Sequence, residues 1–252
     1  MFIDTHCHLT DEYDDGINAV IRRATDAGVK TLICATANPK DIESVLTIIN
    51  NYDNVYATIG IHPDYTDTNA YDYLTDNVLK HPHVVGIGEI GLDYHYRTNN
   101  REDQIKLFES QLQIALNNNL PVAIHTRDAE EDTASILTDK YHGVMHCFTS
   151  SWDLAKLMLD RGFYFSASGI ITFKNAESVR ETFAKIPNDR IVIETDSPYC
   201  APIPYRGKTC EPAMVIETAK VLAQIKNLQL SELEFILMNN TKRLYPKCNV
   251  KL

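Results

Sequence analysis

Two histidines separated by one residue lie near the start of the chain, in the stretch MFIDTHCHLT. If this stretch is a strand, residues i and i+2 point to the same face, so His6 and His8 share a face. Asp4 would lie on that face as well, one layer below. Paired imidazoles suit a transition-metal ion. Cys7 would point the opposite way, toward packed helices, and is expected to be a small core residue and not a nucleophile.

Other polar residues also stand at the ends of short apolar runs. In chain order, the polar residues at the ends of such runs are His6, His8, His62, Glu89, His125, Arg127, His146, Glu194 and Asp196. Five of the nine histidines belong to this set, which random placement would rarely produce. His81 and His83 differ, because in KHPHVVG they precede an apolar run and would enter that strand from its far end.

The elements that would position these residues alternate regularly along the chain. Strand-like runs are expected at 1–8, 30–36, 55–63, 83–91, 121–127, 142–148, 163–169 and 190–196. Helical patterns follow them at about 17–28, 39–50, 71–80, 100–119, 128–140, 152–162, 176–186 and 211–226. Gly28 is a good stop for the first helix. The tail SELEFILMNNTKRLY predicts one or two further amphipathic helices.

Strict alternation of strands and helices predicts parallel strands joined by crossover helices. Eight such units in a chain of this length are typical of a TIM barrel. We therefore expect an α/β fold: one TIM (β/α)8 barrel domain over 1–252, with an extra C-terminal helix or helices. The rival is an open doubly wound sheet, which normally has a Gly-rich turn after its first strand. That turn here is HCHLTDEY, which contains no glycine. In a TIM barrel, the polar strand ends meet at one rim, where such enzymes place their chemistry.

The cysteine spacing, the hydrophobic pattern and the net charge limit the location and the binding partners expected for this chain. The six cysteines are dispersed without a CxxC pair, which is typical of reduced thiols in a cytoplasmic protein. We see no signal-peptide pattern and no apolar run long enough for a membrane span. The net charge of −10 argues against broad electrostatic binding to nucleic acid or anionic membrane. We therefore expect no membrane association, and a nucleic acid substrate would need local cations or bound metal. No protein partner is predicted.

The rim offers four histidines and two carboxylates as metal ligands. Six ligands are too many for one open catalytic zinc, which usually has three protein ligands. Two ions that share a bridging carboxylate would use them all. Such a pair, about 3.5–4 Å apart, can polarise a phosphoryl oxygen and generate hydroxide from water. The ligand types suit Mg, Mn, Zn, Co or Ni.

Several motifs occur together and in a fixed order: FIDTHCHL, GIHP, GEIGLDY, PVAIHTRDA, HCF, ETDSPYCAP, RGK and EP. Together they resemble the TatD family of metal-dependent deoxyribonucleases, within the amidohydrolase-like TIM barrels. The resemblance runs from Phe2 to about Pro212, and NNTKRLY is similar to the family's usual ending. It implies hydrolysis of DNA phosphodiester bonds, often from the 3′ end. The implied substrate is DNA, single-stranded or at chain ends.

The resemblance also implies a role for each matched residue. His6 and His8 would hold one ion, and Glu89 would bridge it to a second ion. His125 and His146 would complete the second ion's ligands. Asp196 would bind the first ion and orient or deprotonate the attacking water, so that the catalytic carboxylates would be Asp196 and Glu89.

Two loops depart from the family pattern. The stretch after HCF is usually Ser-Gly-Ser, whereas here it is Thr149-Ser150-Ser151. The family usually has asparagine before EP, where this chain has Cys210. Both lie in loops expected near the substrate mouth, so they bear on substrate preference and leave the metal ligands intact.

Three residues are candidate substrate contacts, each with a plainer alternative. His62 would contact phosphate or a water at the metal site, or cap its loop. Arg127 would reach a substrate phosphate, or form a salt bridge with Glu194 or Asp128. Arg206, together with Lys208, would clamp a phosphate, or lie in a solvated loop.

Three buried acids would support the site. Asp93 would support a metal ligand or cap a turn. Asp4 and Glu194 would be costly to bury unpaired, so hydrogen bonds to ligand histidines or to an arginine are expected.

Two other functions remain open from the sequence. The same barrel and ligands could hydrolyse a small amide, ester or lactone, since fold alone does not decide function. A non-catalytic metal-binding or scaffold protein is the third alternative, although nothing in such a role requires an open two-ion site.

Overall fold

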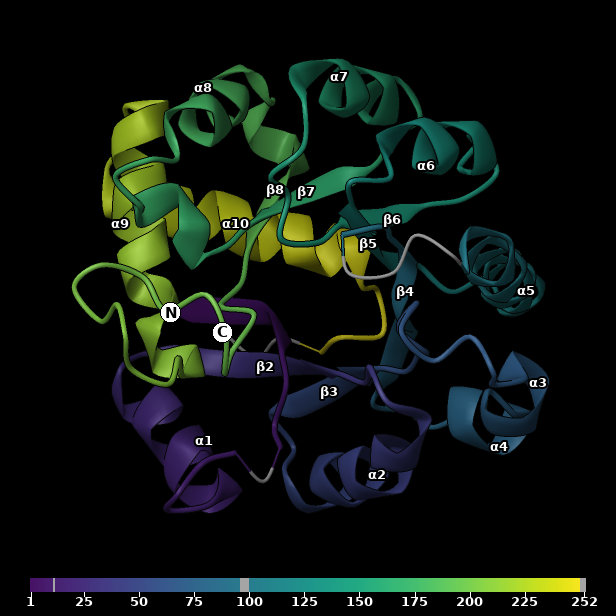
Figure 1. Cartoon of the computed structure of the whole chain (residues 1–252). Coiled ribbons are helices and arrows are strands. Elements are labelled where there is room, and N and C mark those ends of the chain that lie inside the picture. Colours follow the sequence, from purple (N-terminus) through teal and green to yellow (C-terminus); the bar gives the residue numbers. More distant parts are fainter. Residues whose placement is uncertain (11, 96–99, 250–252) are drawn as a thin grey trace.

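Eight parallel strands surround a central axis, with helices packed around them (Figure 1). The computed structural model describes residues 1–10, 12–95 and 100–249. The strands are β1 (Phe2–Cys7), β2 (Val29–Ala35), β3 (Val55–Thr58), β4 (Val84–Asp93), β5 (Val122–Arg127), β6 (Gly143–Met145), β7 (Tyr164–Ala167) and β8 (Ile191–Ile193). Each pairs with the next in parallel, and a parallel bridge from Cys7 to Ser197 joins the first and last. The predicted TIM barrel is confirmed.

A helical region follows each strand and covers the outside of the barrel. The α-helices are α1 (Ile17–Asp26), α2 (Ile42–Asn51), α3 (Ala70–Tyr73), α4 (Asp76–Leu79), α5 (Arg101–Asn118), α6 (Glu130–Ile136), α7 (Trp152–Asp160), α8 (Glu177–Lys185), α9 (Val215–Lys226) and α10 (Leu230–Leu244). Short 3₁₀ turns are η1 (Pro39–Asp41), η2 (Gly169–Thr172), η3 (Asn188–Arg190) and η4 (Pro212–Met214). Gly28 follows α1 with a φ of 94°, a left-handed conformation that glycine adopts without strain.

The extra C-terminal helix predicted from the tail is α10, which lies behind the barrel in Figure 1 and packs against β1 and β8. Just after it, the fully buried ring of Tyr245 packs among inward-facing side chains such as Ile33, Val85 and Val192. This cluster closes the N-terminal end of the barrel, so the opposite end is left for chemistry. None of the helices in the described part of the chain has the length and apolar character that a bilayer crossing requires.

Several predicted elements are shorter than expected. The predicted helix 71–80 is two short helices, α3 and α4, because the backbone leaves the helical region at Leu74 and Thr75. The helix predicted at 128–140 is only α6, since Asp128 has a left-handed φ of 54°. The predicted single domain over 1–252 stays a prediction, and its residues 11, 96–99 and 250–252 lie outside the described part of the chain.

Two strands carry an irregularity where they approach the site. β1 pairs Asp4 with Leu32 but Cys7 with Cys34, so three steps along β1 match two along β2. Such a bulge resets the alternation of side chains. Asp4 therefore shares a face with Cys7, not with His6. The prediction that Asp4 lies one layer below His6 is wrong, whereas Cys7 is buried in the outer core as predicted.

A second bulge lies in β4. Ile87 pairs with Val122 and Ile90 with Ile124, so β4 has one extra residue in this interval. Glu89 lies within it, and Thr36 accepts a hydrogen bond from its backbone N–H at 2.9 Å. The bulge lets Glu89 point inward while Ile87 and Ile90 both pack in the outer core.

Candidate metal centre

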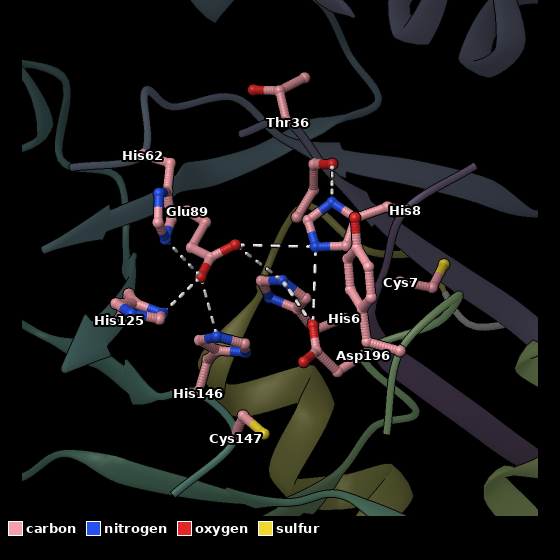
Figure 2. Close-up of polar contacts among 12 residues, drawn as sticks. His6, Cys7, His8, Thr36, His62, Glu89, His125, His146, Cys147 and Asp196 are labelled. Carbon is pink, nitrogen blue, oxygen red and sulfur yellow. Dashed lines mark hydrogen bonds and ion pairs between the residues drawn. The ribbon is translucent and has the colours of Figure 1, made fainter. Parts of the chain in front are cut away.

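Polar side chains from six of the eight strand regions converge at the C-terminal end of the barrel. Figure 2 shows their side chains pointing toward one another around one carboxylate, that of Glu89. The converging residues are His6, His8, His62, Glu89, His125, His146 and Asp196. All six residues predicted to hold metal thus lie together, and His62 lies beside them.

The two carboxylate oxygens of Glu89 face different histidines. Oε1 lies 2.7 Å from Nδ1 of His125 and 3.0 Å from Nε2 of His146. Oε2 lies 3.5 Å from Nε2 of His6 and 3.6 Å from Nε2 of His8. A carboxylate placed in this way between two pairs of imidazoles has the geometry of a bridging ligand.

Asp196 joins the pair formed by His6 and His8. Its Oδ1 lies 3.6 Å from Nε2 of His8 and 3.9 Å from Nε2 of His6. Asp196 lies beyond the end of β8, at a left-handed φ of 57°, and its backbone N–H donates to the carbonyl of His6 at 3.0 Å. The turn after β8, and not strand alternation, therefore aims this carboxylate.

In three of the histidines, the ring nitrogen that does not face Glu89 has a hydrogen-bond partner of its own. Nδ1 of His146 lies 3.0 Å from Oε1 of Glu194, and Nε2 of His125 lies 3.0 Å from Oδ2 of Asp93. Nδ1 of His8 lies 3.0 Å from the carbonyl of Ala35. Such partners fix the ring orientation of metal-ligating histidines. Glu194 therefore has the histidine partner that the sequence predicted.

Asp4 is paired differently from the prediction. Its carboxylate accepts hydrogen bonds from the backbone N–H of Thr195 at 2.9 Å and from the Thr195 hydroxyl. The backbone N–H of His6 also donates to it at 3.3 Å. Among the described residues, its hydrogen-bond partners are thus backbone and threonine groups and include no histidine ring or arginine.

His6 provides a test of whether a cation fits this site. Its side chain is almost completely buried, yet neither ring nitrogen has a hydrogen-bond partner among the described residues. A buried polar atom without a partner is costly. A divalent ion beside Nε2 of His6, Nε2 of His8 and Oε2 of Glu89 would give Nε2 of His6 a partner and remove its share of that cost. Ligand atoms of these three residues lie within 4.8 Å of one another, as do those of Glu89, His125 and His146.

The ionised state of Glu89 and Asp196 also favours cation binding at this site. Burial raises the pKa of Glu89, but the neighbouring His146 and His125 outweigh it and hold that pKa well below its usual range. Burial likewise opposes ionisation of Asp196, but His8 and other histidines lower its pKa overall. Both carboxylates are therefore negatively charged at neutral pH.

The second His-x-His pair lies at the other end of the barrel, as predicted. Nδ1 of His83 contacts the carbonyl of Val55, the first residue of β3, at 2.9 Å. Nε2 of His81 lies 3.1 Å from Oδ1 of Asn50. Both histidines are thus bound to the N-terminal side, away from Glu89.

The predicted substrate contacts lie at the rim with different surroundings. Nε2 of His62 is 3.8 Å from Oε1 of Glu89, while its Nδ1 accepts the backbone N–H of Asp64 at 3.2 Å. His62 therefore both faces the site and caps its loop. Arg127 ends β5 as an exposed residue. The Arg206 guanidinium stands over the ring of Phe173, 3.9 Å from its centroid.

The structure places both stretches that differ from the family pattern. The first, at 149–151, keeps the family's final serine, and this Ser151 caps α7, accepting the backbone N–H of Leu154 at 3.2 Å. Cys210 lies in the loop after β8, but its side chain is fully buried. This side chain therefore does not line the mouth, and the expectation that the departure bears on substrate preference stays a prediction.

Two buried glutamines were missed by the sequence reasoning. Gln104 bonds both backbone groups of Asp93, accepting its N–H at 2.8 Å and donating to its carbonyl at 2.7 Å. Gln111 does the same for Ile61, at 2.8 and 2.9 Å. Gln104 and Gln111 lie seven residues apart in α5, so both side chains are on one face of the helix. This spacing is the feature of the sequence that could have revealed them. The two glutamines fix the end of β4 at Asp93 and the segment that leads into His62.

Comparison with known proteins agrees with this geometry. A family model described as TatD related DNase matches residues 3–246. YabD of Bacillus subtilis, an uncharacterized metal-dependent hydrolase, is 39% identical over 97% of this chain and 99% of its own length. YcfH of Escherichia coli K12, also an uncharacterized metal-dependent hydrolase, is 37% identical over 96% of this chain and 95% of its own.

A solved structure agrees as well. The crystal structure of YjjV, a TatD homolog from Escherichia coli K12, superposes with a TM-score of 0.90 at 29% identity. The superposition covers 97% of this chain and 98% of that one. The chain is therefore a metal-dependent hydrolase and belongs to the TatD family.

Proposed function

We propose that this protein is a divalent-metal-dependent deoxyribonuclease that cleaves DNA phosphodiester bonds. The observation that carries the proposal is the position of Glu89, whose two oxygens face two separate pairs of imidazoles. Two adjacent cations are the arrangement used for in-line displacement at phosphorus. The description of the matching family as TatD related DNase supports DNA as the substrate.

The ligands divide into two groups with Glu89 in common. His6, His8 and Asp196 would hold the first ion. His125 and His146 would hold the second. The ions would be drawn from Mg, Mn, Zn, Co and Ni, because imidazole and carboxylate together suit all of these. When bound, the pair would supply the Lewis acid that polarises a phosphoryl oxygen and favours ionisation of water.

Asp196 is the catalytic carboxylate of this proposal. Its negative charge at neutral pH lets it accept a hydrogen bond from the attacking water, orient that water toward phosphorus and take its proton. Glu89 contributes by keeping the two sets of imidazoles at a fixed separation. Glu194 and Asp93 hold the rings of His146 and His125 in orientation.

The substrate contacts are few, which suits the charge of the chain. A net charge of −10 does not support a long electrostatic track along DNA. His62, Arg127 and Arg206 would grip one or two phosphates beside the ions. We therefore propose single-stranded DNA or chain ends as substrates, with exonuclease-like cleavage. The six unpaired cysteines fit a cytoplasmic location.

The test compares substrate classes on one preparation of metal-loaded protein. Short single-stranded DNA, labelled at either end, is assayed beside a panel of small amides, esters and lactones. We expect metal-dependent DNA cleavage that a chelator abolishes and added Mn²⁺ or Mg²⁺ restores. Hydrolysis of a panel compound with DNA left intact would contradict the proposal and identify the alternative chemistry on the same barrel.

A further inference from the structure

Two cysteines lie beside Asp196, the catalytic carboxylate of the proposed function. Cys147 follows β6, and Cys200 lies in the loop after β8. Sγ of Cys200 is 3.5 Å from Oδ2 of Asp196. One ligand atom each from Cys147, Cys200 and Asp196 lies within 4.8 Å of the others. Figure 2 shows Cys147 near His146, on the Asp196 side of the site.

These two cysteine residues are less buried than the other four. Cys7, Cys34, Cys210 and Cys248 are all buried, with at most 4% of their surface exposed. Cys147 and Cys200 are partly exposed. Sγ of Cys147 donates to Oγ of Ser168 at 3.1 Å. Once that thiol is ionised, the hydroxyl can donate to it instead.

The two carboxylate oxygens of Asp196 face different groups. Its Oδ1 faces His8 and His6, whereas its Oδ2 faces Cys200. The three residues Cys147, Asp196 and Cys200 have φ angles of 41°, 57° and 54°. Left-handed backbone is uncommon for residues other than glycine and concentrates at functional sites. Here it brings three donor atoms from two separate loops together.

We propose that Cys147, Cys200 and Asp196 form a further metal site, selective for a thiophilic divalent cation such as zinc or cadmium. Tetrahedral zinc holds its sulfur and oxygen ligands roughly 3.5–4 Å apart. The 3.5 Å between Sγ of Cys200 and Oδ2 of Asp196 already has this spacing. Each thiol releases its proton to solvent as its bond to the cation forms. Hard ions such as Mg²⁺ and Mn²⁺ avoid thiolate ligands.

Occupancy of this site would inhibit the enzyme. A cation bound to Oδ2 of Asp196 would reduce the negative charge that remains on Oδ1, the oxygen that faces the histidines. The same carboxylate would then be shared between catalysis and the thiol site. This consequence rests on the proposed nuclease function, whereas the binding itself does not.

The direct test is optical titration of the whole protein with Co²⁺ and Cd²⁺ under a phosphine reductant. Thiolate ligands give charge-transfer absorption that imidazole and carboxylate ligands do not. We expect this absorption in the wild type and in the double variant His6→Ala with His8→Ala. Cys147→Ser and Cys200→Ser each remove one of the two thiolate ligands. Each variant should absorb much less and lose at least about tenfold in cadmium affinity, since even an outer partner is worth 10–100-fold. Cys248→Ser, which removes a buried thiol at the far end of the barrel, should keep the absorption.

Absence of thiolate absorption in the wild type, which requires no variant to fold, would overturn the proposal. Equal absorption in wild type and in a Cys200→Ser protein of unchanged Tm would also overturn it.

A second readout separates this inference from the proposed function. Cd²⁺ added to Mn²⁺-supported DNA cleavage should inhibit the wild type, and Cys200→Ser should be less sensitive relative to its own uninhibited rate. Equal inhibition of both proteins would refute the inhibitory role. If no DNA is cleaved at all, the nuclease proposal fails, while the absorption titration still decides the thiol site.

Discussion

Nδ1 of His125 lies 2.7 Å from Oε1 of Glu89, the shortest contact between this carboxylate and the surrounding histidines. Burial alone would lower the pKa of His125, but hydrogen bonds to Asp93 and Glu89 outweigh it and raise that pKa to about 9. Below this pH the imidazole keeps a proton that a cation must displace. Metal binding at this site is therefore linked to proton release.

We expect cation affinity at the His125 site to increase with pH up to about 9 and to level off above it. The ideal slope is about tenfold per pH unit for each proton displaced. Calorimetric titration in buffers of different ionisation enthalpy measures both the affinity and the released protons. Affinity that does not change over this range, with no proton release, would show that His125 is not a ligand.

The two His-x-His pairs provide a matched comparison. Replacing His6 and His8 together by alanine should abolish metal-dependent activity, because both face Glu89 and Asp196. Replacing His81 and His83 together should leave activity nearly unchanged, because they bond Asn50 and the carbonyl of Val55 at the other end of the barrel. Turnover and metal content are measured on both double variants. Comparable losses in the two would contradict the assignment of the site to the rim that holds Glu89.

In the proposed two-ion site, Glu194 would support the second ion through His146 without contacting that ion. Its Oε1 accepts from the backbone N–H of Cys147 at 2.6 Å and lies 3.0 Å from Nδ1 of His146. Glu194→Gln removes the charge of this side chain. It should lower the affinity for the second ion by roughly 10–100-fold while the first ion stays bound. Metal titration followed by elemental analysis gives the two affinities.

The control for this variant is Glu177→Gln, which removes an exposed acid paired with Arg180 on α8. It should leave both affinities as in the wild type. Unchanged second-ion affinity in Glu194→Gln would mean that His146 does not need this partner to bind metal.

Local sequence patterns predicted the barrel and which residues gather at its rim, because alternation and strand ends are visible in the chain itself. They failed at the bulges. Asp4 was assigned to the face of His6, but the extra residue in β1 moves it to the face of Cys7. A bulge depends on pairing with a neighbouring strand, which no local pattern encodes.

The orientation of Asp196 is not encoded in a local sequence pattern either. Its inward direction comes from a left-handed turn and a hydrogen bond to the carbonyl of His6, 190 residues earlier in the chain. Gln104 was overlooked for the same kind of reason, since its partner Asp93 becomes visible only when α5 packs on β4. Contacts between distant segments set these details.

In the proposed mechanism, Asp196 acts on a water that attacks phosphorus in DNA. Asn at this position keeps the size and one acceptor oxygen but loses the negative charge. Asp196→Asn should fold with a Tm close to that of the wild type and keep the second ion, whose ligands are Glu89, His125 and His146.

The deciding measurement is the turnover of a short single-stranded DNA by metal-loaded wild type and Asp196→Asn, with metal content determined in the same samples. We expect the wild type to cleave and the variant to be slower by roughly 10²–10⁴-fold. A well-folded, metal-loaded Asp196→Asn protein that cleaves DNA at nearly the wild-type rate would contradict the account.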